Sequence, residues 1–181
     1  METLTPKDYF TDPKWSNYGL LDVRSPGEYS TGKLPGAQSL SLFSDAERAK
    51  VGTLYKQTSP DAALLTGLEI AGGKMRWLVE EARRLAPDNK VVVHCWRGGQ
   101  RSESVAWLLE RAGFEVVKLT GGYKAARHHI RKYLGEEQHQ RRVLGGHTGT
   151  GETPILLGMG ELGADVIDME GLTSHGGSAL G

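Results

Sequence analysis

The sequence predicts an α/β domain of three layers, in which helices cover both faces of a mostly parallel central sheet. The clearest strand is 91–93, three consecutive valines, because a run that is apolar on both faces is typical of a buried parallel strand. The segment 75–85 places apolar side chains at helical spacing, with charged residues on the opposite face. Strand and helix patterns alternate in this way along the chain, which is the arrangement that crossover helices require.

Local signals predict the remaining elements of this domain. The segment 19–24 is a short apolar run that ends in charged residues and a Ser-Pro-Gly turn, so we expect a strand there. A second short apolar stretch covers 37–42. Apolar residues at helical spacing over 105–112 indicate a helix, which Gly113 closes, and 115–119 is predicted to be the next strand.

The character of the chain changes near residue 135. The segment is first polar and then rich in glycine, and it ends at Gly181. It is expected to form one strand–loop–helix–strand unit, and a piece this short buries too little surface to fold alone. We therefore divide the chain into a domain over 1–134 and an incomplete unit over 135–181.

Composition excludes several classes of protein. The 181 residues include 22 Lys plus Arg and 22 Asp plus Glu, so no overall charge attracts nucleic acid. No apolar run approaches the ~18–20 residues that cross a bilayer. Residues 1–10 lack the apolar stretch of a signal peptide, and a cytoplasmic location is predicted. A single cysteine can form neither an intramolecular disulfide nor a cysteine-rich metal site, and no metal is expected.

That cysteine, Cys95, stands between the predicted 91–93 strand and the next helix. Ligands of open α/β sheets bind beyond the carboxyl ends of strands. Two glycines allow a tight loop whose N–H groups form an anion cradle, and the helix that follows adds its positive N-terminal end. We expect the pKa of Cys95 to lie below the free value of ~8.5, which makes it the candidate nucleophile. The residues expected to hold an anionic donor are Trp96, Arg97, Gly98, Gly99, Gln100, Arg101 and Ser102.

Two other interpretations of this loop exist. A lone cysteine is often just a small buried hydrophobe. The spacing from Cys95 to Arg101 also fits C-x5-R, the cradle of cysteine phosphatases. A tyrosine phosphatase needs a carboxylic acid on a mobile loop. The nearest imitation is Asp88, in the turn before the 91–93 strand, which is a poor place for such an acid.

Several segments resemble known families. Residues 21–29 and 32–37 resemble the opening signature of rhodanese domains, with Lys33 where that family usually has histidine. The wider pattern resembles the tRNA 2-selenouridine synthase family and extends over nearly the whole chain. The segments that carry this wider resemblance are 47–56, 95–102, 121–124, 143–153 and 166–172.

The resemblance implies a rhodanese domain joined to a P-loop domain. The family replaces the sulfur of wobble 2-thiouridine in tRNA with selenium from selenophosphate, and geranyl diphosphate serves as a further co-substrate. By this resemblance Cys95 carries the selenium. Asp22 and Arg24 would brace the site from the neighbouring strand end, or form only a structural ion pair. Trp96 would stack on a base or simply wedge the loop.

A degenerate P-loop lies in the second unit. Residues 146–153 match G-x4-G-K-[ST] except at the lysine, which is Glu152. A carboxylate ~4 Å from a phosphate charge costs ~4 kcal/mol at an effective dielectric of ~20, so useful binding of a nucleotide or geranyl diphosphate is not expected. The residues assigned to this motif are Gly146, Gly149, Gly151, Glu152 and Thr153.

Basic residues concentrate between 118 and 142. Contacts from such a patch would be made to phosphates and would carry no sequence information. A solvated helix face is the alternative interpretation. The family resemblance, and not the charge count, favours tRNA as the partner. The candidate tRNA contacts are Lys124, Arg127, Arg131, Lys132, Arg141 and Arg142.

Three hypotheses follow from the sequence. The first is a transferase of the tRNA 2-selenouridine synthase type, in which Cys95 takes selenium and Arg97 and Arg101 hold anionic oxygens. The second is a general sulfurtransferase that uses thiosulfate or a persulfide. The third is a non-catalytic fragment that binds tRNA or supplies a rhodanese half to a separate P-loop partner chain.

Overall fold

The computed structural model describes residues 2–136, 142–147 and 151–168 of the chain. The chain separates into two compact units, 1–137 and 138–181. Within the described ranges, no helix combines the length and the apolar character needed to span a membrane.

The first unit is built on a five-stranded sheet with the order β1-β5-β4-β2-β3, and all neighbouring strands are parallel. The strands are β1 (Glu2–Leu4), β2 (Gly19–Asp22), β3 (Gln38–Ser39), β4 (Lys90–His94) and β5 (Glu115–Leu119). The valine run lies in β4, the central strand, where it is fully buried. The predicted parallel α/β sheet is confirmed.

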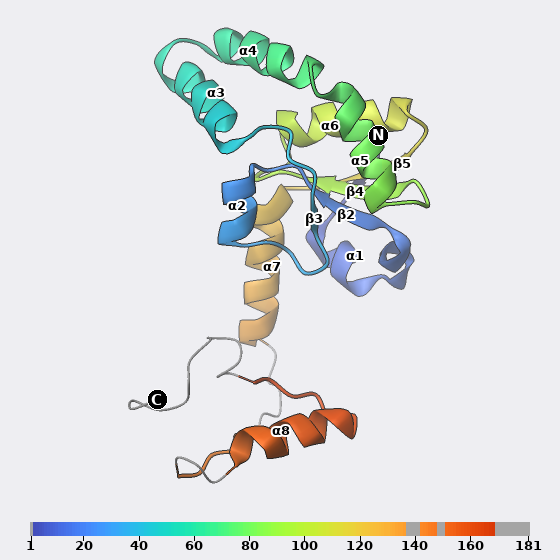
Figure 1. Ribbon diagram of the computed structural model, residues 1–181, viewed down its shortest axis with the longest axis vertical. Helices are drawn as coiled ribbons and strands as arrows, with labels where there is room; N and C mark the ends of the chain where they lie inside the picture. The colour runs from blue at the N-terminus through green and yellow to red at the C-terminus, as the bar shows by residue number, and fades with distance from the viewer. Residues whose placement is uncertain (1, 137–141, 148–150, 169–181) are drawn as a thin grey trace. The chain divides into compact units, whose positions relative to one another are not determined.

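Helices cover both faces of the sheet (Figure 1). Val91 and Val93 belong to a core with residues of α5 and α6, whereas Val92 belongs to a second core with residues near α1 and α7. The three-layer prediction is therefore confirmed. The helices of this unit are α1 (Pro6–Thr11), the 3-10 helix η1 (Pro13–Asn17), α2 (Pro26–Thr31), α3 (Asp45–Gln57), α4 (Pro60–Gly72), α5 (Met75–Leu85), α6 (Gln100–Arg111) and α7 (Gly122–Glu136).

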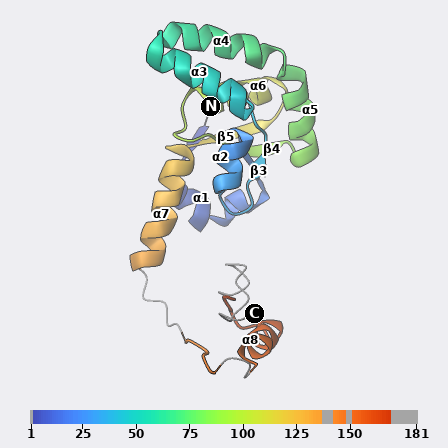
Figure 2. The same ribbon diagram turned by 60° about the vertical axis from the view of Figure 1, so that its left-hand side comes forward.

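A helical hairpin, α3 and α4, lies between β3 and α5 in the chain (Figures 1 and 2). Sequence periodicity does not predict this hairpin, because α3 is largely polar and α4 largely apolar all round, so neither shows one apolar stripe. Local capping marks its start: the Ser44 hydroxyl accepts from the Glu47 N–H, and the Glu47 carboxylate accepts from the Ser44 N–H.

In the second unit, α8 (Glu152–Glu161) follows Gly151, whose φ is +87°. The expected helix is present, but the expected strands are not: residues 142–147 and 164–168 form none. Val143 is 94% exposed, because a short apolar stub without a neighbouring strand has nothing to pair with. The strand–loop–helix–strand prediction is therefore wrong for its strands. Gly149 of the P-loop motif lies outside the described residues.

Candidate active site

Cys95 comes directly after β4, at the carboxyl edge of the sheet. In the parallel register Asp22 of β2 lies opposite His94, and the Val23 N–H donates to the His94 carbonyl at 2.9 Å. The two strands therefore end at the same level. This brings Asp22 and Arg24 beside the cysteine loop.

The loop is packed against the start of α7. The N–H of Tyr123 donates to the Cys95 carbonyl at 2.9 Å, and the N–H of Lys124 donates to the Trp96 carbonyl at 3.0 Å. Gly122 makes this close approach possible, because its φ is +57° and a Cβ there would lie 2.4 Å from the Cys95 oxygen. The first turn of α7 therefore occupies two carbonyls of the loop and holds its backbone in place.

The Cys95 thiol lies within this loop and is 4% exposed. Its Sγ is 3.3 Å from the Ser102 hydroxyl and 3.9 Å from the Gly99 carbonyl. Burial alone would raise the pKa of Cys95. Hydrogen bonds from the Ser102 hydroxyl, the Ser102 N–H and the Arg97 N–H, together with the Arg101 charge, outweigh burial and lower this pKa. The direction is the one predicted from the loop sequence, and a thiolate is the reactive form.

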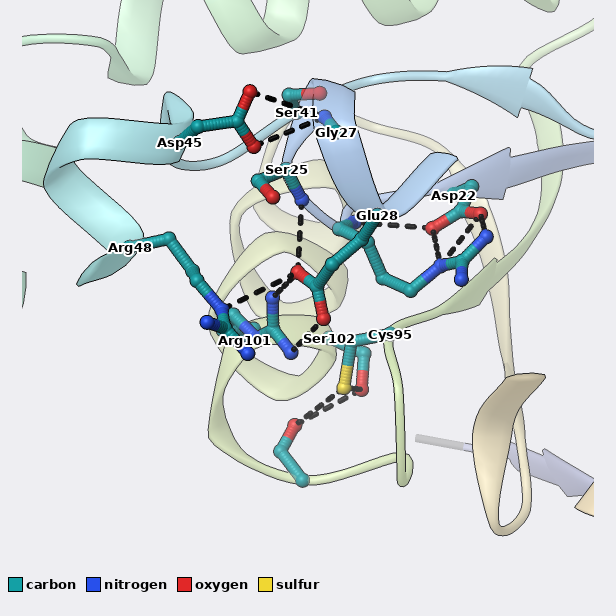
Figure 3. A network of polar contacts seen from close by, with 12 residues as sticks. Asp22, Ser25, Gly27, Glu28, Ser41, Asp45, Arg48, Cys95, Arg101 and Ser102 are labelled. Carbon is teal, nitrogen blue, oxygen red and sulfur yellow. Dashed lines mark hydrogen bonds and ion pairs between the residues drawn. The ribbon is translucent and has the colours of Figure 1, made fainter. Parts of the chain in front are cut away.

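Glu28 holds Arg101 over the loop. Its carboxylate contacts both Arg101 and Arg48 (Figure 3), at 2.6 Å from Arg101 Nη1 and 3.8 Å from Arg48 Nε. The Ser25 N–H also donates to this carboxylate, at 3.1 Å. Burial would raise the pKa of Glu28, but the hydrogen bond and charge of Arg101, the Ser25 N–H and Arg48 lower it. Glu28 is therefore an ionised acceptor that orients Arg101.

Arg24 and Asp22 form a fully buried ion pair. Arg24 Nε donates to both Asp22 oxygens at 2.9 Å, and Nη2 donates to Asp22 at 2.5 Å and to the Gly32 carbonyl at 2.7 Å. The guanidinium carbon lies 3.8 Å from the centre of the Tyr123 ring. The pair therefore contacts Tyr123, the residue whose N–H donates to the Cys95 carbonyl.

His94 is a further buried polar residue at this edge of the sheet. Burial lowers its pKa more than the nearby Asp22 charge raises it. Its Nε2 is 3.8 Å from Asp22, and among the described residues this nitrogen has no hydrogen-bond partner. His94 is therefore neutral at physiological pH.

An open hollow of about 800 Å³ lies over Cys95. The loop contributes Arg97, Gly99, Gln100 and Arg101 to its wall, α3 contributes Arg48 and Tyr55, and α7 contributes Arg127. Five arginines line the hollow, against Glu28 as the one carboxylate of its described wall. This electrostatic balance suits a small oxyanion presented to the thiolate.

The structure adds residues that the sequence did not single out. Glu28 could have been recognised from the capping box that it forms with Ser25, although not its contact with Arg101. Arg48 and Tyr55 belong to a family-like segment, but no local pattern places α3 at the hollow. Tyr123 supports the loop through both its backbone and its ring.

Several predicted residues lie elsewhere. Ser102 is fully buried and contacts the thiol instead of lining the hollow. Arg141 is outside the described residues, and Arg142 belongs to the second unit. Asp88 lies in the turn that precedes β4, at the opposite end of the strand from Cys95, which leaves the phosphatase interpretation without its acid. Within the described ranges, no three His, Cys, Asp or Glu side chains gather as metal ligands.

The Cys95 loop is lined by arginines and follows the central strand of a parallel sheet. The model of the rhodanese-like domain family matches residues 7–129. The chain belongs to this family.

Individual curated proteins are similar to this chain over almost its whole length. The chain is 44% identical to the tRNA 2-selenouridine synthase of Bdellovibrio bacteriovorus, over 91% of this chain and 44% of that protein. It is 37% identical to the enzyme of that name from Sulfurovum sp., over 100% of this chain and 50% of that protein. The chain thus spans about half the length of the curated relatives that it matches.

A solved structure supports the fold. The N-terminal domain of a Clostridium difficile 630 protein described as ATP/GTP binding superposes with a TM-score of 0.65 and 31% sequence identity. The match covers 71% of this chain and 98% of that domain. The similarity in fold therefore extends to a domain that lies at the N-terminus of another protein.

Proposed function

We propose that this chain is the rhodanese-containing part of a tRNA 2-selenouridine synthase-type transferase, with Cys95 as the residue that carries selenium. The single observation behind this proposal is the Cys95 thiol of lowered pKa beneath five arginines. The identity to curated tRNA 2-selenouridine synthases supports tRNA as the substrate. The family resemblance adds selenophosphate as the donor and 2-thiouridine as the acceptor. Arg97 and Arg101 would hold the anionic oxygens of the donor.

In the proposed loading step, the thiolate attacks the terminal chalcogen atom of the donor. A bond forms between Cys95 Sγ and sulfur or selenium. The bond from that atom to the rest of the donor breaks, and its electron pair stays on the departing oxyanion. The oxyanion is sulfite when the donor is thiosulfate. When the donor is selenophosphate the oxyanion is phosphite, so phosphorus(V) accepts the two electrons that formation of the S–Se bond removes and leaves as phosphorus(III).

In the proposed transfer step, the terminal selenium anion attacks C2 of the 2-thiouridine, and sulfide leaves. The uridine is then joined to Cys95 through an S–Se bond. Two equivalents of a small-molecule thiol reduce that bond and leave as a disulfide, so selenium stays on the uridine and the Cys95 thiol is regenerated. Cys95 is the attachment point until this reduction.

We propose that geranyl diphosphate does not bind to residues 151–168 of this chain. Glu152 stands where the phosphate-binding lysine would be, and residues 142–147 and 164–168 supply no strand beside α8. Both features argue against a diphosphate site in residues 138–181.

Intact-mass analysis tests the loading step. The full chain is incubated with thiosulfate and, separately, with selenophosphate, and wild type is compared with Cys95→Ala. We expect a gain of one sulfur or one selenium atom that is absent from the variant. Because Cys95 is the only cysteine, the adduct is assigned without digestion.

The other outcomes discriminate between mechanisms. Sulfur loading without selenium loading would favour a general sulfurtransferase. A gain of a phosphoryl group would show that the thiolate attacks phosphorus, as in a cysteine phosphatase. No adduct from either donor, with a thiol that still reacts with iodoacetamide, would overturn the proposal and favour a non-catalytic binding role.

A further inference from the structure

The hollow over Cys95 continues along α7. A second hollow of about 580 Å³ adjoins it, and both are lined by Trp96, Tyr123 and Arg127. Away from the cysteine, the second hollow is lined by basic side chains of α7, including Lys124 and Arg131. The two hollows therefore form one surface depression that leads from the nucleophile to the basic face of a helix.

The basic residues of α7 form a single stripe. The stripe consists of Lys124, Arg127, His128, Arg131 and Lys132, which lie at positions i, i+3, i+4, i+7 and i+8 and are all exposed. It extends for about 12 Å along the helix axis, at about 1.5 Å per residue. The opposite side of the helix packs inward: Ala126 and Ile130 join the core, and His129 stacks on Phe10. A merely solvated helix would not need all its cations on the side that borders the hollow.

Three cations of the stripe are available to a ligand. Within the described part of the chain, no carboxylate lies within 4.0 Å of the charged groups of Lys124, Arg127 or Arg131. Neighbouring cations differ: Arg101 is paired with Glu28, and Lys118 is paired with Glu103. Unpaired cations in a row are suited to successive phosphates of a nucleic-acid backbone.

Trp96 lies between this stripe and the nucleophile. Its ring centre is 5.4 Å from that of Tyr123, with 37° between the planes. Arg24 lies over both rings, 3.8 Å from the centre of Tyr123 and 5.8 Å from the centre of Trp96. Tyr123 is 7% exposed, whereas Trp96 is only partly buried. Of these two rings, therefore, Trp96 is the one that can offer a face to a base.

We propose that a single-stranded segment of RNA lies along α7, with its phosphates on the stripe and one unstacked base on Trp96 beside Cys95. This inference rests on the proposed function, in which tRNA is the acceptor, and it specifies how that acceptor is held. A single strand is required because Cys95 is 4% exposed. A base must leave its stack to bring C2 into the hollow, and unstacked bases are recognised by aromatic platforms.

Binding of a tRNA anticodon stem–loop to the full chain tests the stripe, measured between 50 and 200 mM salt. Three phosphate contacts predict a slope near −2 in log K against log salt, which is roughly a twenty-fold weakening over that range. The double variant Lys124→Gln/Arg131→Gln should weaken by only about three-fold over the same range. The control Arg83→Gln/Arg111→Gln removes the same charge from α5 and α6, and it should keep the wild-type slope.

The platform is tested with Trp96→Leu and Trp96→Phe, on the same stem–loop and on a blunt RNA duplex. Trp96→Leu should lose about ten-fold in affinity for the stem–loop, and Trp96→Phe should recover most of it. A wild-type slope in the α7 variant, or a duplex bound as tightly as the stem–loop, would overturn the inference.

The outcome is separable from that of the proposed function. Loading of wild-type Cys95 by small donors is measured without RNA, and RNA binding is measured without a donor. If Cys95 is loaded but the α7 variant keeps the wild-type salt slope, only the proposed RNA path along α7 is refuted. If Cys95 is not loaded but the α7 variant shows a reduced salt slope, only the proposed chemistry of Cys95 is refuted.

Discussion

The Cys95 loop and the glycine-rich segment before α8 have similar sequences, but they differ in their structural surroundings. Each has a glycine at positive φ, Gly98 in the first and Gly151 in the second, and each leads into a helix. The Cys95 loop is held between the central strand, the Asp22–Arg24 pair and the first turn of α7. In the described part of the second unit, no strand precedes or follows α8. An anion-binding motif thus becomes a site only when a sheet and a second helix hold its backbone.

The largest expected effect comes from removing the brace of the loop. Asp22→Asn leaves the charge of Arg24 uncompensated in a site with no exposure, which should cost about 3–5 kcal/mol of unfolding free energy. Denaturant unfolding of the full chain measures this loss. The matched control is Glu80→Gln, which breaks the exposed Arg76–Glu80 pair and should leave the midpoint where it is in wild type. Equal midpoints for the two variants would mean that the buried pair contributes no more than the surface pair.

A comparison of Gly122→Ala with Gly151→Ala sharpens the contrast between the two regions. At Gly122 a Cβ would lie 2.4 Å from the Cys95 oxygen and 2.7 Å from the Gly98 nitrogen, so the loop must shift. We expect a loss of about 3 kcal/mol and little loading of Cys95 by thiosulfate. At Gly151 nothing lies within 4 Å, so the cost is about 1 kcal/mol and should be confined to α8.

Thermal unfolding and intact mass follow the first variant, and amide hydrogen exchange of α8 follows the second. If Gly122→Ala loads at the wild-type rate, the contact between the loop and α7 does not position the nucleophile.

Ser102→Ala should have a moderate effect, which is restricted to the reactivity of the Cys95 thiol. The Ser102 hydroxyl helps to lower the pKa of Cys95, so its loss raises that pKa and reduces the thiolate fraction at pH 7. Alkylation by iodoacetamide at pH 7 should slow by roughly ten-fold. At a pH above the Cys95 pKa of both proteins, the alkylation rates of variant and wild type should converge. Ser102→Thr keeps the hydroxyl and should restore the profile, whereas an unchanged profile for Ser102→Ala would exclude this role.

Glu152→Lys should have the smallest effect. It completes G-x4-G-K-T, but the phosphate cradle also needs the strand that orients its loop. We therefore expect no saturable binding of ATP or geranyl diphosphate by isothermal titration calorimetry, for the variant or for wild type. Micromolar binding by Glu152→Lys would show instead that one charge is what separates this segment from a working P-loop.

Much of the sheet could be predicted, and much of the site could not. Periodicity over 75–85 correctly predicted α5, and the valine run correctly predicted β4. Both predictions work because a buried face requires apolar residues at regular positions in the sequence. The loop around Cys95 was predicted for the same reason: its chemistry is local. Contacts between Glu28 and Arg101, 73 residues apart, and the arrival of Arg48 from α3 depend on tertiary packing that no short pattern records.

The opposite error occurred in the second unit. The two strands predicted for this unit are not formed over 142–147 or 164–168, because a strand is a property of a pair and the described residues offer no partner. Local apolarity is evidence for burial only where a neighbouring surface exists.

The near-complete enclosure of the Cys95 sulfur bears on the lifetime of any atom that it carries. An added sulfur or selenium extends the side chain by about 2 Å, and Cys95 lines a hollow of about 800 Å³ that has room for the added atom. The resting thiol is shielded from bulky oxidants because Cys95 is 4% exposed. These 181 residues contain no second thiol that could resolve the adduct. The loaded cysteine therefore acts as a reservoir, emptied by an incoming molecule and not by the chain itself.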